Sequence, residues 1–241
     1  IGICGTDREI AHGGRANAPK GSNELVLGHE MLGKVVEVGS DVTSVKPGDY
    51  ALFTVRRSCG ACHACENERN DMCSTGNYTE RGIKERDGFM AEYVIDDEKY
   101  CIKIPNSIAD VGVLTEPMSV SVKAIDEAIK IQTARIPGAT YEEWPKGKKA
   151  LVVGLGPIGL LAAFDLRLRG VEVIGMDIVD ESSPRPSLLK EIGGSYVNGK
   201  TISAYDIDAT YGQIDMVFEA AGVPKLGFDL IDALGINGVY I

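Results

Sequence analysis

Four of the six cysteines of this chain, Cys59, Cys62, Cys65 and Cys73, lie in the short segment 59–73, CGACHACENERNDMC. Disulfide frameworks are typical of small secreted domains that are too short to bury a core. This chain has 241 residues, of which 44% are hydrophobic, so it can bury a core without cross-links. A disulfide framework is therefore a poor explanation for the cluster.

The spacing C-x2-C-x2-C-x7-C allows three sulfurs to meet at a tight turn and a loop to return the fourth. Four thiolates in a tetrahedron are a typical ligand set of a structural zinc ion. The residues between them are small or turn-forming, so ligation would have to hold the segment in shape. An iron–sulfur cluster uses similar spacings and is the competing interpretation. We predict a structural zinc held by these four cysteines, with His63 at the surface and Cys101 buried and inert.

The charge balance of 25 basic against 35 acidic residues gives a net charge of −10. This argues against nucleic acid and anionic membranes as partners. No run of about 18 apolar residues is present that would span a bilayer. We therefore expect a cytoplasmic protein whose partners are small molecules.

Hydrophobic patterning predicts an α/β fold in two domains, 1–114 and 115–241. The first contains short β-like runs broken by glycine and proline, at 24–39, 48–55 and 89–97. A helical pattern follows at 119–136 and ends at Pro137–Gly138. Segment 148–177 predicts strand, glycine turn, helix and strand, and two further strands at 215–222 and 237–241 flank a helical stretch near 224–234. This order predicts a parallel sheet in the second domain.

A G-x-G-x-x-G motif follows the first strand of that sheet and opens a helix, which is the context of a dinucleotide site. We expect its backbone to hold a pyrophosphate through Gly154, Leu155, Gly156, Pro157, Ile158 and Gly159. Asp177 ends the second strand, where a carboxylate binds ribose hydroxyls and favours NAD over NADP. A solvated acid at the strand end is the alternative role. Arg185 lies within reach of a 2′-phosphate, which leaves NADP open.

The first domain also holds scattered metal-ligand types in ICGTD, LGHE and LTEP: Cys4, His29 with Glu30, and Glu116. A catalytic zinc needs about three protein ligands and one open position. Spacing alone does not prove such a site here. Taken singly, these residue types are more often a packed thiol, a core histidine and a solvated acid.

In their order, GICGTD, GHE, the four-cysteine lobe, EP and G-x-G-x-x-G together resemble the zinc-dependent medium-chain dehydrogenase/reductase superfamily. The resemblance covers essentially the whole chain. It implies a GroES-like catalytic domain, a Rossmann domain and a cleft between them. The family's chain is longer at both ends, so this sequence resembles a fragment that starts inside the first domain and stops near the fifth Rossmann strand. The resemblance also implies a catalytic zinc held by Cys4, His29 and Glu116, with Glu30 as a direct or water-bridged ligand.

The stretches GTDREI, VRRSCGAC and TGNYTERGIKERDGFMAEY are similar to the archaeal-type glucose (aldose) 1-dehydrogenases. Glu116 stands where simple alcohol dehydrogenases carry a zinc-binding cysteine, and Glu9 where they often carry a relay histidine. Glu80 matches a glutamate that binds sugar hydroxyls in those enzymes. Val55 replaces an asparagine that touches the sugar in some members, and the Met-Asp-Ile run at 176–178 replaces a basic run for the NADP phosphate. Both changes leave the sugar and the coenzyme preference open.

The resemblance implies oxidation of the C1 hydroxyl of an aldose such as D-glucose to an aldonolactone, with hydride transfer to NAD or NADP. Thr6 would pass on the hydroxyl proton; capping the helix of TDREIAHG is its alternative role. Thr6, Glu80 and Glu116 would contact the substrate.

Two other hypotheses stay open. One is a zinc polyol or secondary-alcohol dehydrogenase of the sorbitol or threonine type. The other is a non-catalytic dinucleotide-binding protein with one zinc per chain. The resemblance also implies a homodimer or homotetramer.

Overall fold

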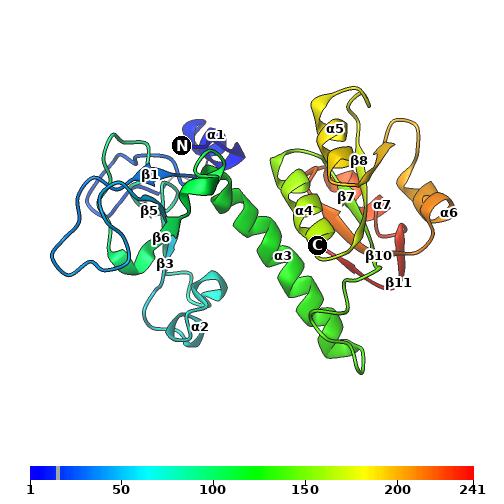
Figure 1. Cartoon of the computed structure of the whole chain (residues 1–241), viewed down its shortest axis with the longest axis horizontal. Coiled ribbons are helices and arrows are strands. Elements are labelled where there is room, and N and C mark those ends of the chain that lie inside the picture. Colours follow the sequence, from blue (N-terminus) through cyan, green and yellow to red (C-terminus); the bar gives the residue numbers. More distant parts are fainter. Residues whose placement is uncertain (15–16) are drawn as a thin grey trace. The chain divides into compact units, whose positions relative to one another are not determined.

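We describe a computed structural model of the chain, which covers residues 1–14 and 17–241. The chain folds into two compact units, Ile1–Glu116 and Pro117–Ile241, and Figure 1 labels most of their helices and strands. The boundary predicted between residues 114 and 115 lies two residues before this division. Each unit is described by itself.

The first unit contains two small three-stranded sheets. One is antiparallel in the order β1-β2-β6, with the bounds Gly33–Lys34, Tyr50–Phe53 and Cys101–Ile104. The other has the order β3-β4-β5, with the bounds Arg56–Arg57, Thr79–Arg81 and Glu85–Arg86. The short helices of this unit are α1 (Gly5–Ala11) and α2 (His63–Glu66).

Two of the β-like runs of this unit differ from their prediction. Segment 24–39 forms only β1 and a single bridge between Gly2 and Glu30. Segment 89–97 forms no strand in the described structure, and Tyr93 and Ile95 are 73% and 92% exposed. The backbone N–H groups of residues 88–90 instead donate irregularly to the carbonyls of residues 26–28. A strand needs a regular ladder with a partner, and apolar composition alone does not supply one.

The second unit is a five-stranded parallel sheet in the order β11-β10-β7-β8-β9. The bounds, in that order, are Leu234–Tyr240, Ile214–Glu219, Lys149–Val153, Glu172–Asp177 and Ser195–Asn198. The first strand in sequence, β7, therefore lies at the centre. The next two strands, β8 and β9, lie on one side of it, and β10 and β11 lie on the other. This is the strand order of a Rossmann fold, whose ligands bind at the carboxyl ends of the strands where the order reverses.

Helix α3 (Thr115–Arg135) begins two residues before the division and continues into this unit, which also contains α4 (Pro157–Leu168), α5 (Pro184–Glu191), α6 (Ile207–Tyr211) and α7 (Pro224–Asp229). Alternate residues of β7 enter different apolar clusters, because side chains alternate across a strand. Ala150 and Val152 pack with α3 and α4, whereas Leu151 and Val153 pack with residues of α6. Helix α3 begins earlier than predicted and includes Pro117, since proline is tolerated in the first helical turn.

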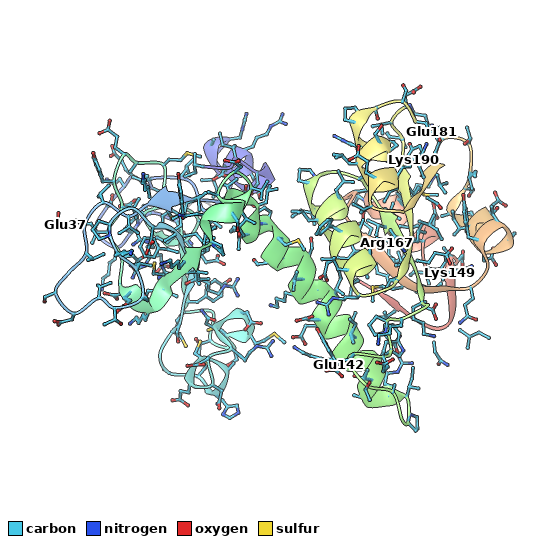
Figure 2. The ribbon with its side chains drawn as sticks, in the orientation of Figure 1. Glu37, Glu142, Lys149, Arg167, Glu181 and Lys190 are labelled. Carbon is cyan, nitrogen blue, oxygen red and sulfur yellow. The ribbon has the colours of Figure 1, made fainter. Side chains whose placement is uncertain are left out.

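Arg167 lies in the last turn of α4 and connects this helix to the segments around α5 and β8 (Figure 2). Its guanidinium donates to the carbonyls of Ile192 and Val171 at 3.0 and 2.9 Å. These bonds satisfy carbonyl groups just after α5 and just before β8, so they tie the C-terminal end of α4 to both elements. No helix in the described part of the chain is both long and apolar enough to cross a membrane.

Candidate active site and metal centres

The four clustered cysteines meet in space. Their sulfur atoms all lie within 4.8 Å of one another, and Cys62 and Cys65 are buried. All six cysteines of the chain are free thiols. Backbone N–H groups of Cys65 and Ser74 lower the pKa of the Cys62 thiol to about 5, which favours the thiolate. This donor set fits a tetrahedral metal ion, and His63 is exposed outside it.

The start of α1 places the first member of a second cluster. Cys4 is the N-cap of α1: its sulfur accepts from the Thr6 N–H at 3.3 Å, while its own N–H donates to Asp7 at 3.0 Å. The alternative role of Thr6 as the N-cap is therefore wrong, because Thr6 lies inside the first turn. The reciprocal bonds of Cys4 and Asp7 form a capping box, which fixes where the Cys4 sulfur points.

His29 lies at the centre of this second cluster and is only 5% exposed. Its Nε2 atom lies 3.1 Å from the Cys4 sulfur, and its Nδ1 atom lies 3.4 Å from Oδ1 of Asp7. Asp7 is buried and also accepts the Gly28 N–H at 3.3 Å. Asp7 was not predicted as a site residue. The C-x-x-D spacing of a capping box was the signal in the sequence that could have revealed it.

Two carboxylates approach the same histidine. Ligand atoms of His29, Glu30 and Glu116 all lie within 4.8 Å of one another. Burial, together with the negative charges of Glu30 and Asp7, raises the pKa of Glu116 to about 7. Buried acids that repel one another in this way are stabilised by a positive charge between them. His29 thus belongs to two groups of donors, one with Cys4 and Asp7 and the other with Glu30 and Glu116, and the donor types of both suit a divalent cation such as zinc.

The segment of Glu80 packs against the residue that precedes His29. Gly82 has a φ of +70°, and a side chain there would meet the Gly28 carbonyl oxygen at 2.5 Å. The Phe89 N–H also donates to this oxygen at 2.8 Å. Only glycine allows so close an approach of two backbones. The structure thus brings the strand end that carries Glu80 next to the LGHE segment.

The glycine motif occupies the turn between β7 and α4. Gly156 is the N-cap of α4, and Pro157 is its first residue. A side chain at Gly159 would lie 1.8 Å from the carbonyl oxygen of Gly154, so the tight turn requires glycine at this position. The N-terminus of α4 thus presents free N–H groups at the carboxyl edge of the sheet.

Asp177 lies beside this turn, at the end of β8. Its carboxylate accepts the N–H groups of Leu155 and Ile178 at 2.8 and 2.6 Å. Arg185 approaches the same carboxylate to 3.4 Å. Leu155 is fully buried, and its N–H is bonded to Asp177. Asp177 therefore holds the glycine turn, and its role as the ribose ligand stays a prediction.

The two folds and the two donor clusters define a medium-chain dehydrogenase/reductase. The alcohol dehydrogenase GroES-like domain family matches residues 1–106. The family described as "Glucose dehydrogenase C-terminus" matches residues 109–241. The chain belongs to the glucose dehydrogenase family within that superfamily. The recognition and the fold class predicted from the sequence are confirmed.

Known relatives agree with this assignment. A glucose 1-dehydrogenase of Methanocella arvoryzae is 41% identical over 99% of this chain and 64% of its own length. One of Vulcanisaeta moutnovskia is 40% identical over 100% of this chain and 64% of its own length. Haloferax mediterranei glucose dehydrogenase, solved in complex with NADP, Zn and gluconolactone, matches 100% of this chain and 66% of its own, with a TM-score of 0.84 and 33% identity. The chain thus spans 64% of the length of these curated relatives.

Proposed function

We propose that the protein oxidises the C1 hydroxyl of an aldose such as D-glucose to the aldonolactone and reduces NAD or NADP. The C1–H bond breaks as a hydride leaves, the hydroxyl loses its proton, and a carbonyl forms. The observation that carries this proposal is the convergence of Cys4, Glu30 and Glu116 on buried His29 in a chain of the glucose dehydrogenase family. The relative solved with NADP, Zn and gluconolactone supports the same reaction.

In this proposal Cys4, His29 and Glu116 hold a catalytic zinc ion, and Glu30 is a direct or water-bridged ligand. A bound zinc ion makes a hydroxyl group or water far more acidic, toward a pKa of about 7. The Asp7 carboxylate, which lies 3.4 Å from Nδ1 of His29, orients the imidazole ring. Cys59, Cys62, Cys65 and Cys73 hold a second, structural zinc ion.

Other side chains bind the substrates and move the proton. The Thr6 hydroxyl can both accept and donate, so it passes the substrate proton toward solvent. Glu80 accepts hydrogen bonds from sugar hydroxyls. The turn of Gly154–Gly159 and the start of α4 bind the pyrophosphate of the coenzyme, and Asp177 binds its adenosine ribose.

We further propose that the protein works in the cytoplasm as a homodimer or homotetramer. Its net charge of −10 suits small-molecule substrates better than nucleic acid. Sedimentation of the purified protein would give the oligomeric state directly.

The test is a substrate panel with the full-length, zinc-loaded protein. D-glucose, sorbitol and a secondary alcohol are each offered with NAD and with NADP, and the product is identified. Reduction with D-glucose and formation of gluconolactone are the expected result. Turnover of sorbitol alone would favour the polyol alternative, for which the match to galactitol-1-phosphate dehydrogenase from Escherichia coli, at 26% identity, is the supporting observation. No turnover and one zinc per chain would favour the non-catalytic alternative.

A further inference from the structure

Arg56 and Glu80 face each other across two paired strands. Strand β3 runs antiparallel to β4, and the two residues are direct partners in the register. The Nε and Nη2 atoms of Arg56 both donate to the same oxygen, Oε1 of Glu80, at 2.9 and 2.8 Å. The Glu80 side chain is only 16% exposed. Two charge-assisted bonds to one oxygen restrict where that oxygen lies.

The other oxygen of this carboxylate is left available. Within residues 1–14 and 17–241, no hydrogen bond to Oε2 of Glu80 is present. Both bonds from the Arg56 guanidinium go to Oε1, so Arg56 leaves Oε2 without a bond from its side chain. A carboxylate with one fixed and one open oxygen can accept a hydrogen bond from a ligand hydroxyl without reorganising.

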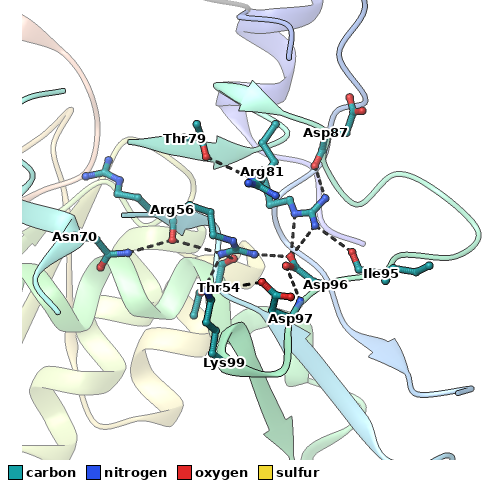
Figure 3. A network of polar contacts seen from close by, with 12 residues as sticks. Thr54, Arg56, Asn70, Thr79, Arg81, Asp87, Ile95, Asp96, Asp97 and Lys99 are labelled. Carbon is teal, nitrogen blue, oxygen red and sulfur yellow. Dashed lines mark hydrogen bonds and ion pairs between the residues drawn. The ribbon is translucent and has the colours of Figure 1, made fainter. Parts of the chain in front are cut away.

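Arg56 is itself held from several sides. Its Nη1 atom donates to the carbonyl of Asp71 at 3.0 Å, and the guanidinium stacks over the ring of Tyr78 at 4.0 Å. The side-chain amide of Asn70 donates to the Arg56 carbonyl at 3.1 Å (Figure 3). Asp71 lies in the four-cysteine lobe, two residues before Cys73. The lobe therefore anchors Arg56, and Arg56 anchors Glu80.

The opposite face of the same strands is fixed by a second ion cluster. Arg57 and Arg81 both donate to Oδ2 of Asp96, at 2.6 and 2.7 Å, and all three side chains are largely buried. Figure 3 shows the guanidinium of Arg81 at the Asp96 carboxylate. Since Arg57 neighbours Arg56 and Arg81 neighbours Glu80, this cluster holds the backbone beneath the Arg56–Glu80 pair. Motion of the Glu80 carboxylate thus depends mainly on Arg56.

We propose that Arg56 is a positioning residue for the sugar, which sets the orientation of the Glu80 carboxylate. This inference rests on the proposed function. It extends that function to Arg56, a residue that acts on the sugar only through Glu80. Arg56 acts through Glu80, so the two residues form one unit in substrate binding. The pair discriminates by geometry: only a hydroxyl that meets Oε2 in its fixed orientation is bound well.

The test compares KM for D-glucose, KM for the coenzyme and kcat in three variants of the full-length protein. We expect Arg56→Met to raise KM for D-glucose about tenfold, because the Glu80 carboxylate loses its orientation and with it one charge-assisted bond to the sugar. KM for the coenzyme should stay within about twofold of the wild-type value. Arg56→Lys keeps the charge but not the planar pair of donors, so it restores only part of the loss. Arg86→Met, an exposed arginine of the same sheet, is the matched control and leaves all three constants unchanged.

A double-mutant cycle with Glu80→Gln separates positioning from a structural role. If Arg56 acts through Glu80, Arg56→Met changes KM for D-glucose by less than about twofold in the Glu80→Gln protein. Equal effects of Arg56→Met in both backgrounds, or an unchanged KM in the single variant, would overturn the inference. Wild-type protein that fails to oxidise any aldose would instead overturn the proposed function. Thermal unfolding of each variant shows whether it is folded. If Arg56→Met is not folded, Arg56→Lys takes its place in the cycle.

Discussion

The carboxylate of Asp7 lies 3.4 Å from Nδ1 of His29, and both side chains are nearly free of solvent contact. The opposite ring nitrogen, Nε2, faces the Cys4 sulfur at 3.1 Å. A carboxylate behind an imidazole fixes the tautomer and makes the other nitrogen a stronger ligand. Because Asp7 also caps α1 together with Cys4, one carboxylate lies close to His29 and fixes the position of Cys4.

This relationship predicts the effect of neutralising Asp7. Asp7→Asn keeps an acceptor oxygen but loses the charge, so the affinity of the catalytic site for zinc should fall about 10- to 100-fold. Competition with a chromophoric chelator measures that affinity. Asp110→Asn, which changes an exposed acid, is the control and should bind zinc as the wild type does. Unchanged affinity in Asp7→Asn would show that Asp7 has no role in the site.

The four-cysteine lobe predicts a separable metal ion. We expect two zinc ions per chain in the wild type and one in Cys65→Ser, because Cys65 is a buried member of the closed cluster. The variant should be cut by protease within residues 59–73, since ligation holds this segment together. Cys101→Ser lies outside the lobe and should retain both ions. Two zinc ions in Cys65→Ser, or iron and visible absorbance in the wild type, would contradict a structural zinc site.

Acid stability should depend on Asp96. Burial acts to raise the pKa of Asp96, but hydrogen bonds from Arg57 and Arg81 outweigh it and lower that pKa below its ordinary value. A group whose pKa is lower in the folded state stabilises the protein above its unfolded pKa, about 3.9. That stabilisation is lost as the pH falls below about 4 and through the folded pKa. We therefore expect the free energy of unfolding to decrease from pH 5 to pH 3, with a smaller slope in Asp96→Asn.

At neutral pH the same variant should lose about 3–5 kcal/mol of stability, because two buried guanidinium groups are left without their counter-charge. Urea denaturation measures this change. Asp97→Asn alters the neighbouring carboxylate, which is 73% exposed, and should stay within about 0.5 kcal/mol of the wild type. Equal losses in the two variants would contradict a buried ion cluster.

Coenzyme preference should depend on Asp177 and Arg185. Asp177→Asn keeps the acceptor for the Leu155 N–H but removes a charge that repels a 2′-phosphate, so the ratio of kcat/KM for NADP to that for NAD should rise about tenfold. Adding Arg185→Ala should cancel this gain, since the Arg185 guanidinium lies 3.4 Å from that carboxylate and could bind the phosphate instead. Asp180→Asn, an exposed acid of the following loop, is the control. An unchanged ratio in Asp177→Asn would assign Asp177 only to holding the turn.

The Rossmann unit was largely predictable from the sequence, because its signals are local. The apolar run before Gly154 and the apolar helix after it produced β7 and α4 where the pattern indicated them. Helix α7 is shorter than the predicted stretch near 224–234, ending at Asp229. Apolar periodicity continues beyond that point, but the backbone N–H groups of residues 231–234 donate to carbonyls three residues earlier, so the α-helix gives way to tight turns.

The first unit was predicted less well, because its structure depends on contacts between distant segments. Whether segment 89–97 forms a strand depends on a neighbouring strand to pair with, and the local sequence pattern does not predict such a neighbour. Cys4, His29 and Glu116 could be grouped only by resemblance, since they lie far apart in the chain. The roles of Asp7 and Arg56 follow from neighbours that only the fold brings together, namely His29 and Glu80.

Transfer of a label from the sugar tests the central claim most directly. The full-length, zinc-loaded protein is incubated with D-glucose deuterated at C1 and with NAD or NADP, and the reduced coenzyme is analysed by mass spectrometry. We predict that the reduced nicotinamide carries one deuterium and that the lactone carries none at C1. Reduced coenzyme without deuterium, or no reduction with D-glucose, would contradict oxidation of an aldose at C1.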